Sequence, residues 1–216
     1  MSEIKIAIAD DHKIFRKGVM VSLRHYSQLK FVLEAENGQE LLDGIDATKP
    51  DVILMDLSMP VKDGIETTKY ISEKYPHIHI LVLTMHEEEK FVVHLMENGA
   101  DGYLLKSSDP VEIKKAIIEV MDKGCYLNNF VSRILVKKSQ LKNLPTPFIN
   151  KSIELSEKEK EVLEKICLEH TSQQIGEKMG ISARTVESIK ERLMEKCGTK
   201  NTAGLVFFAV KNKLID

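Results

Sequence analysis

Polar side chains that could handle a phosphoryl group follow four short apolar runs in this chain. They are the pair Asp10-Asp11, then Asp56, Thr84 and Lys106. Three carboxylates form an oxygen-only cluster suited to a hard cation such as Mg²⁺. The cation would relieve their repulsion and hold a phosphoryl oxygen, leaving one carboxylate free to attack phosphorus and form an aspartyl phosphate. Lys106 would neutralise a second phosphoryl oxygen, and the Thr84 hydroxyl would donate a hydrogen bond to a third.

The apolar runs that precede these residues have the length and the β-branched content of buried strands. We expect strands near residues 4 to 9, 30 to 35, 51 to 55, 78 to 83 and 101 to 105, with helices between them. This alternation predicts an α/β fold, a doubly wound five-stranded parallel sheet. Because ligands bind outside the carboxyl ends of such strands, the polar residues would meet at one edge of the sheet.

Each of these residues also has an ordinary interpretation. Asp11 could cap the next helix, and Asp56 could occupy a turn. Thr84 could be a plain strand residue and Lys106 a surface residue. Their shared position after strands favours a single site over four unrelated roles. His12 and His86 flank that site, but a hard cation prefers oxygen ligands, so we expect both at its rim.

The charge of the 216-residue chain divides unevenly. Residues 126–216 carry 16 Lys and Arg against 11 Asp and Glu, a net charge of +5, whereas residues 1–125 carry 15 against 22, a net charge of −7. An acidic cation-binding half joined to a half that binds a polyanion would have this asymmetry. The sequence has neither a signal-peptide pattern nor an apolar window long enough to span a membrane, so we expect a cytoplasmic protein.

The second half of the chain reads as helical. Apolar residues from Leu127 to Leu135 form a stripe that predicts a connector helix, and residues 139–152, which contain Pro145 and Pro147, are expected to be a linker. Further on, two short helices joined at Gly180 form a helix-turn-helix pattern. The expected parts are an α/β domain at residues 1–125, a connector helix and linker at 126–152, and a small all-α helix-turn-helix domain at 153–216.

Residues 1–125 resemble a bacterial response-regulator receiver domain, which has a flavodoxin-like sheet. The similarity is carried by the stretches LMDLSMP at residues 54–60 and GYLLKS at residues 102–107. It implies that Asp56 is the phosphoacceptor, that Thr84 is the switch hydroxyl and that Lys106 is the invariant lysine. It also implies that Tyr103 and Thr84 rearrange on phosphorylation and so change the face built from the fourth helix, fifth strand and fifth helix.

The same resemblance implies a particular ligand set for Mg²⁺. Asp11, Asp56 and the backbone carbonyl of Ser58 would hold the cation, and Asp10 would act mainly through an outer-shell water.

Residues 153–216 resemble the LuxR-type helix-turn-helix of the NarL/FixJ subfamily of response regulators. The similarity is carried by LSEKEKEVL at residues 155–163, GIS at 180–182 and Thr185-Val186. Residues that turn outward from the third helix are expected to read bases, and flanking cations to contact phosphates. The predicted DNA-binding residues are Arg184, Thr185, Glu187, Ser188, Lys190, Glu191, Arg192, Lys196 and Lys200. Glu187 and Glu191 stand where basic residues are common in the family, which leaves the contacted bases open.

Together these features predict a DNA-binding transcription factor switched by phosphoryl transfer from a sensor histidine kinase to Asp56. It would bind paired half-sites as a homodimer, and it would not be an enzyme, although it would promote its own phosphorylation and dephosphorylation. One alternative is a phosphorylation-controlled module that binds another protein. Another is an aspartate-nucleophile phosphatase, which is disfavoured because Ser58 stands where the general acid of such an enzyme is expected.

Overall fold

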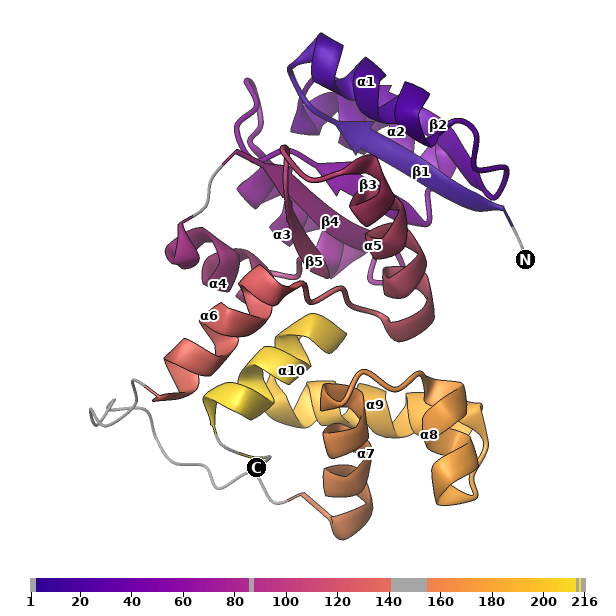
Figure 1. Ribbon diagram of the computed structural model, residues 1–216, viewed down its shortest axis with the longest axis vertical. Coiled ribbons are helices and arrows are strands. Elements are labelled where there is room, and N and C mark those ends of the chain that lie inside the picture. Colours follow the sequence, from indigo (N-terminus) through magenta and orange to yellow (C-terminus); the bar gives the residue numbers. More distant parts are fainter. Residues whose placement is uncertain (1–2, 86–87, 141–154, 213, 215–216) are drawn as a thin grey trace.

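The computed structural model describes residues 3–85, 88–140, 155–212 and 214 (Figure 1). Its first half contains one five-stranded parallel sheet with the strand order β2-β1-β3-β4-β5. The strands are β1 (Ile4–Ala9), β2 (Leu29–Ala35), β3 (Val52–Met55), β4 (His79–Thr84) and β5 (Gly102–Leu105). Their bounds lie within one residue of the predicted ones, and the predicted fold class is confirmed.

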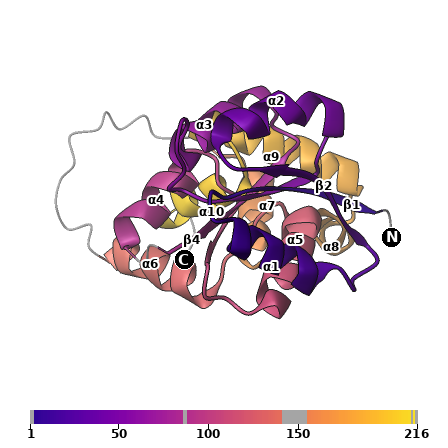
Figure 2. The ribbon, with the colours of Figure 1, turned by 90° about the horizontal axis from the view of Figure 1, so that it is seen from above.

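Five helices connect and follow the strands. They are α1 (Lys13–Leu23), α2 (Gly38–Thr48), α3 (Gly64–Lys74), α4 (Glu89–Glu97) and α5 (Pro110–Lys123). α1 and α5 cover one face of the sheet, and α2 and α3 cover the other (Figure 2). The central strands are therefore buried on both faces, which explains why they read as unbroken apolar runs.

The second half is helical. Its elements are α6 (Asn129–Gln140), α7 (Glu157–Cys167), α8 (Ser172–Met179), α9 (Ala183–Cys197) and α10 (Thr202–Lys211). The last four helices share a core of their own, to which Leu163, Ile175 and Leu193 belong. The predicted linker lies almost wholly outside the described residues. Among the described helices, none is both long and apolar enough to cross a membrane.

Capping side chains set where the C-terminal helices begin. Ser156 and Glu159 form the capping box at the start of α7, each side chain bonding the other's backbone N–H. Thr171 and Gln174 form a second such box at the start of α8, and Ser182 caps α9. Gly180, in the left-handed conformation, ends α8 and turns the chain into the next helix.

The two halves are in contact through α10, which packs against α4 and α6 (Figure 1). Ala203 and Phe207 on α10 share a hydrophobic cluster with Val92 and Met96 on α4. Polar contacts surround this apolar seam. They join Lys200 Nζ to Glu73 Oε1 at 2.9 Å, Lys211 Nζ to Glu97 Oε1 at 3.0 Å, and Asn201 Nδ2 to the Ala100 carbonyl at 3.0 Å.

Candidate functional site

Three carboxylates meet where β1 and β3 end. The register pairs Ala9 with Met55, so the residues that follow these strands lie level with one another. Asp10, Asp11, His12 and Asp56 offer ligand atoms that all lie within 4.8 Å of one another. Asp10 and Asp56 are buried, whereas Asp11 is exposed. The edge of the sheet thus carries an acidic cluster with one carboxylate exposed to solvent.

Lys106, which follows β5, contacts two of these carboxylates. Its Nζ atom lies 2.8 Å from Asp10 Oδ2 and 2.8 Å from Asp56 Oδ2, and its side chain is only 5% exposed. Burial raises the pKa of Asp56 and outweighs the opposite effect of the hydrogen bond from Lys106. Burial also acts to lower the pKa of Lys106, but its contacts with Asp10 and Asp56 raise it, so the lysine stays cationic.

The carboxylate set fits a hard divalent cation. Asp10 Oδ2 is buried and accepts no hydrogen bond of good geometry, although Lys106 Nζ lies nearby. The single ammonium of Lys106 is shared by two buried carboxylates, so negative charge remains on the three acids, and a divalent cation would neutralise it. The donors are oxygens, apart from the exposed His12, whose Nδ1 lies 2.7 Å from Asp11 Oδ1. Oxygen donors favour Mg²⁺ over softer metals.

The other residues predicted for this site lie around it. Thr84 ends β4 and is buried, and its carbonyl accepts a hydrogen bond from the backbone N–H of Lys106 at 2.8 Å. Ser58 is exposed in the loop after Asp56. Tyr103 lies in the interior below the edge, where burial raises its pKa, and its ring centroid is 6.3 Å from that of Phe130 on α6.

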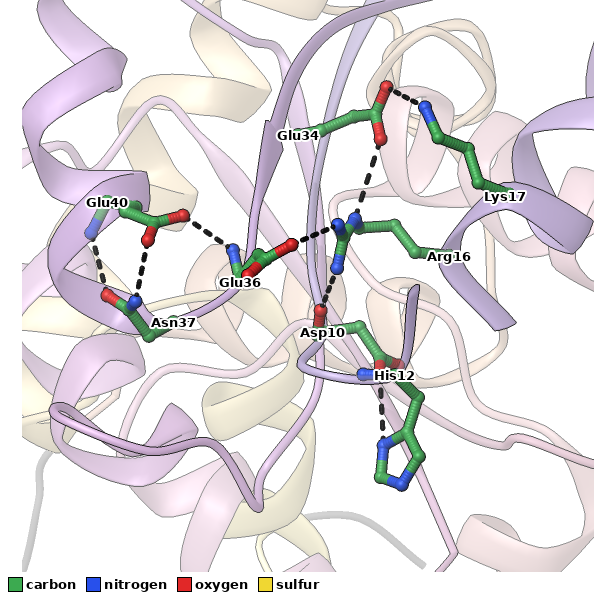
Figure 3. Close-up of polar contacts among 8 residues, drawn as sticks. All are labelled: Asp10, His12, Arg16, Lys17, Glu34, Glu36, Asn37 and Glu40. Carbon is green, nitrogen blue, oxygen red and sulfur yellow. Dashed lines mark hydrogen bonds and ion pairs between the residues drawn. The ribbon is translucent and has the colours of Figure 1, made fainter. Parts of the chain in front are cut away.

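Arg16 is a buried residue of this region that the sequence analysis did not single out. It shares the buried face of α1 with Val19 and Leu23, and its guanidinium reaches the carbonyl of Asp10 (Figure 3). A charged residue at an apolar-face position of an amphipathic helix was the signal that could have revealed it.

The predicted DNA-binding residues lie mainly on the outer face of α9. Val186, Ile189 and Leu193 are buried in the core of the C-terminal domain, as the helical period predicts. The exposed members of the predicted set are Arg184, Glu187, Ser188, Glu191, Arg192, Lys196 and Lys200. Thr185 is half-buried at the start of the helix.

Part of this face is turned toward the first domain. Glu187, Lys190 and Met194 line a cavity of about 280 Å³ together with residues such as Asp101 and Gly124. The Lys190 side chain is only 13% exposed and pairs with Glu187 at 3.3 Å. We expected Lys190 on an open flank of the helix. In the structure it faces the α/β domain, which covers this part of α9.

Comparisons with known proteins match both halves. The family model for the response regulator receiver domain matches residues 6–118, and the model for bacterial regulatory proteins of the luxR family matches residues 154–209. The oxygen regulatory protein NreC of Staphylococcus aureus is 34% identical over 220 aligned residues, which cover 99% of this chain and 100% of that protein.

Solved structures agree with these matches. The RcsB response regulator of Salmonella typhimurium is 30% identical, with a TM-score of 0.58, over 95% of this chain and 97% of that one. A complex of the two-component response regulator RcsB with DNA is 29% identical, with a TM-score of 0.58, over 97% of this chain and 99% of that one.

Proposed function

The chain belongs to the response regulators that join a receiver domain to a LuxR-type DNA-binding domain, and we propose that a sensor histidine kinase switches it by phosphorylating Asp56. Its role is that of a DNA-binding regulator of transcription. We propose boundaries of 1–125 for the receiver, 126–152 for the connector and linker, and 153–216 for the DNA-binding domain. The cytoplasm, where kinase and DNA are both accessible, is the proposed location.

The observation that carries this proposal is the buried carboxylate of Asp56 with Lys106 Nζ at 2.8 Å. A carboxylate oxygen of Asp56 attacks phosphorus, and the bond from phosphorus to the donor's imidazole nitrogen breaks. That nitrogen keeps the electron pair. Lys106 and the Thr84 hydroxyl stabilise the charge on the phosphoryl oxygens. Asp11, Asp56 and the Ser58 carbonyl would hold Mg²⁺, with Asp10 acting through an outer-shell water, and the cation would supply further charge neutralisation.

The position of α10 suggests how phosphorylation controls DNA binding. In the described arrangement α10 packs on α4, and the receiver covers Lys190 on α9. We propose that rearrangement of Thr84 and Tyr103 after phosphorylation alters the α4-β5-α5 face and releases the DNA-binding domain. Two released domains then bind paired half-sites as a homodimer. The protein has no other substrate in this proposal, although it promotes its own phosphorylation and dephosphorylation.

Intact-mass measurement after incubation with Mg²⁺ and acetyl phosphate tests the chemistry. We expect one phosphoryl group on the native chain and none on Asp56→Asn. Asp51→Asn is the matched control, because Asp51 precedes the same strand at its opposite end. Equal phosphorylation of native chain and Asp56→Asn would refute Asp56 as the acceptor.

DNA selection with and without phosphorylation tests the output. A sequence preference that strengthens on phosphorylation supports the proposal. The absence of any DNA preference in both states would favour the protein-interaction module, and turnover of small phosphate esters would favour the phosphatase.

A further inference from the structure

The guanidinium of Arg16 forms a buried fork beside the acidic pair (Figure 3). Its Nη1 donates to the carbonyl of Asp10 at 2.5 Å, and its Nη2 donates to Glu36 Oε1 at 3.0 Å. Its Nε lies 3.5 Å from Glu34 Oε2. The Arg16 side chain is 5% exposed. One side chain thus joins the turn after β1 to the turn after β2.

The carbonyl of Asp10 depends on this contact because the strand ladder has ended. The register of β1 with both β2 and β3 stops at Ala9. Beyond it, the Asp10 N–H still donates to the Ala35 carbonyl at 3.1 Å, and Asp10 Oδ1 accepts from the His12 N–H at 2.8 Å. With Arg16 on its carbonyl, the backbone N–H, the backbone carbonyl and the carboxylate of Asp10 each have a hydrogen-bond partner, which constrains the orientation of this residue.

Glu36, the second partner of Arg16, directly precedes the residue that caps α2. The backbone N–H of Glu36 donates to Glu40 Oε2 at 2.9 Å, and Glu40 exchanges hydrogen bonds with Asn37, the cap of α2 (Figure 3). Arg16 therefore contacts a side chain that is 59% exposed but whose backbone is tied to the capped start of α2. Through Glu36 and Asp10, Arg16 links the turn after β1 to the start of α2.

Attraction between α1 and β2 does not require a buried arginine. Lys17, the next residue, already pairs with Glu34 Oε1 at 2.8 Å from a side chain that is 53% exposed. Burying a guanidinium on an apolar face costs free energy that a surface lysine avoids. The contacts that Arg16 makes and Lys17 does not are those to the Asp10 carbonyl and to Glu36 Oε1, and only the first reaches the acidic pair.

We propose that Arg16 is a positioning residue that holds the Asp10-Asp11 turn in the geometry needed for Mg²⁺ and the phosphoryl group. This inference rests on the proposed function. Arg16 acts through the backbone of Asp10 and through the anchored Glu36, and it touches neither the cation nor the phosphoryl group.

Charge and positioning predict changes of opposite sign. Removing a cation close to a Mg²⁺ site strengthens Mg²⁺ binding by Coulomb's law. Loss of a group that orients a ligand residue weakens metal binding, typically by about 10-fold to 100-fold. A residue that only stabilises the fold would lower the free energy of unfolding and leave the Mg²⁺ affinity of the folded protein unchanged.

The experiment measures the Mg²⁺ dissociation constant of the full chain from amide NMR shifts, together with urea unfolding. We expect Arg16→Met to weaken Mg²⁺ binding on the order of tenfold. Lys17→Met is the matched control, since it removes a neighbouring charge that shares Glu34, and we expect its affinity to be unchanged or slightly higher. Arg16→Lys keeps the charge but replaces the planar guanidinium, whose separate nitrogens reach Asp10 and Glu36, by a single ammonium nitrogen, so we expect weaker Mg²⁺ binding there too.

Unchanged or tighter Mg²⁺ binding in folded Arg16→Met or Arg16→Lys would overturn the inference. If Arg16→Met does not fold, Arg16→Lys decides alone. The proposed function is tested separately by the native chain. A native chain that neither binds Mg²⁺ nor gains a phosphoryl group refutes the function, whereas a native chain that does both, beside unaffected Arg16 variants, refutes only the role of Arg16.

Discussion

Lys106 is the cation that two buried carboxylates share. Its Nζ atom lies 2.8 Å from both Asp10 and Asp56, and the acids would repel each other in its absence. A buried charge that loses its partner destabilises a fold by about 3–5 kcal/mol.

We therefore expect Lys106→Met to lower the free energy of unfolding by about 3 kcal/mol at neutral pH in the absence of Mg²⁺. Addition of Mg²⁺ should restore part of the loss, because the cation takes over the neutralisation of the acids. Urea unfolding with and without Mg²⁺ checks this. An equal loss under both conditions would contradict a shared role of lysine and cation.

Glu159 is an acid whose charge stabilises the DNA-binding domain. The hydrogen bond from Lys196 Nζ at 2.8 Å and those from Ser156 lower the pKa of Glu159 to about 2. A carboxylate whose pKa is lower in the folded state stabilises the fold above the unfolded pKa near 4.5, and this stabilisation is lost as the pH falls toward 2.

The comparison of native chain with Glu159→Gln isolates this effect. Glutamine can still close the capping box, but it cannot pair with Lys196. We expect the difference in unfolding free energy between the two proteins to shrink by about 1 kcal/mol from pH 5 to pH 3, less than the full pKa shift implies because solvent screens the partly exposed Lys196. Glu157→Gln, at a 91% exposed position on the same helix, serves as the control. A difference that stays constant over this range would be inconsistent with the low pKa.

At the scale of elements, the start of α3 is fitted against the loop that carries Asp56. A Cβ on Gly64 would lie 1.9 Å from the Asp56 carbonyl oxygen, so no side chain fits there without moving Asp56, the proposed phosphoacceptor. Gly18, in the middle of α1, has open space around its Cβ position. The two glycines therefore differ in what they contribute.

We expect Gly64→Ala to lower the free energy of unfolding by about 1–3 kcal/mol, as overpacking does, and to reduce the phosphoryl gain from acetyl phosphate. Gly18→Ala should raise the free energy of unfolding by about 0.5–1 kcal/mol, because alanine is the better helix former, and should leave phosphorylation intact. Urea unfolding and intact mass measure both effects. Full phosphorylation of Gly64→Ala would show that the loop tolerates displacement.

The helices and strands were largely predictable because burial produces recognisable apolar patterns in the sequence. β3 and β4 are buried on both faces and therefore appear in the sequence as apolar runs. The capping box of Ser156 with Glu159 predicted the start of α7. The positions of Asp10, Asp56 and Lys106 after strands then predicted that they lie close together, although their contacts could not be predicted. The contact of Arg16 with Asp10 was not predicted, because a helical pattern shows which face is buried but not which carbonyl a buried guanidinium reaches.

At the scale of the whole molecule, the contact between the domains was not predictable from either domain's pattern. Phe207 could equally have faced the core of its own domain, and its neighbours on α4 are visible only in the folded chain. The same holds for Lys190, which is expected on a solvent flank by helical period but faces the receiver. Contacts between surfaces leave no period in a sequence, whereas the core of each domain does.

The ion pairs at this contact allow the coupling between domains to be tested. Glu73 pairs with Lys200 and Glu97 pairs with Lys211 across the boundary. We expect Glu73→Lys combined with Glu97→Lys to destabilise the closed arrangement, since each reversal replaces attraction by repulsion at sites that solvent partly screens. DNA affinity of the unphosphorylated chain should then rise by up to about tenfold, and high salt should reduce the gain.

A control must match the added positive charge, which attracts DNA by itself. Glu3→Lys combined with Glu66→Lys makes the same charge change within the receiver, where these acids pair with Lys30 and Lys62. Fluorescence anisotropy with a labelled duplex compares the two double variants. Equal affinities would mean that the boundary pairs do not hold the domains together.

The contact of α10 with α4 couples DNA binding to the phosphorylation state of the receiver. If phosphorylation opens this contact, then any duplex that binds only the opened chain must favour the phosphorylated state by the same free energy, because coupling between two binding equilibria is reciprocal. At equilibrium, the molecules bound to a promoter would accordingly be phosphorylated to a greater extent than those free in solution. The level of the signal would then be set partly by the number and strength of the sites that receive it.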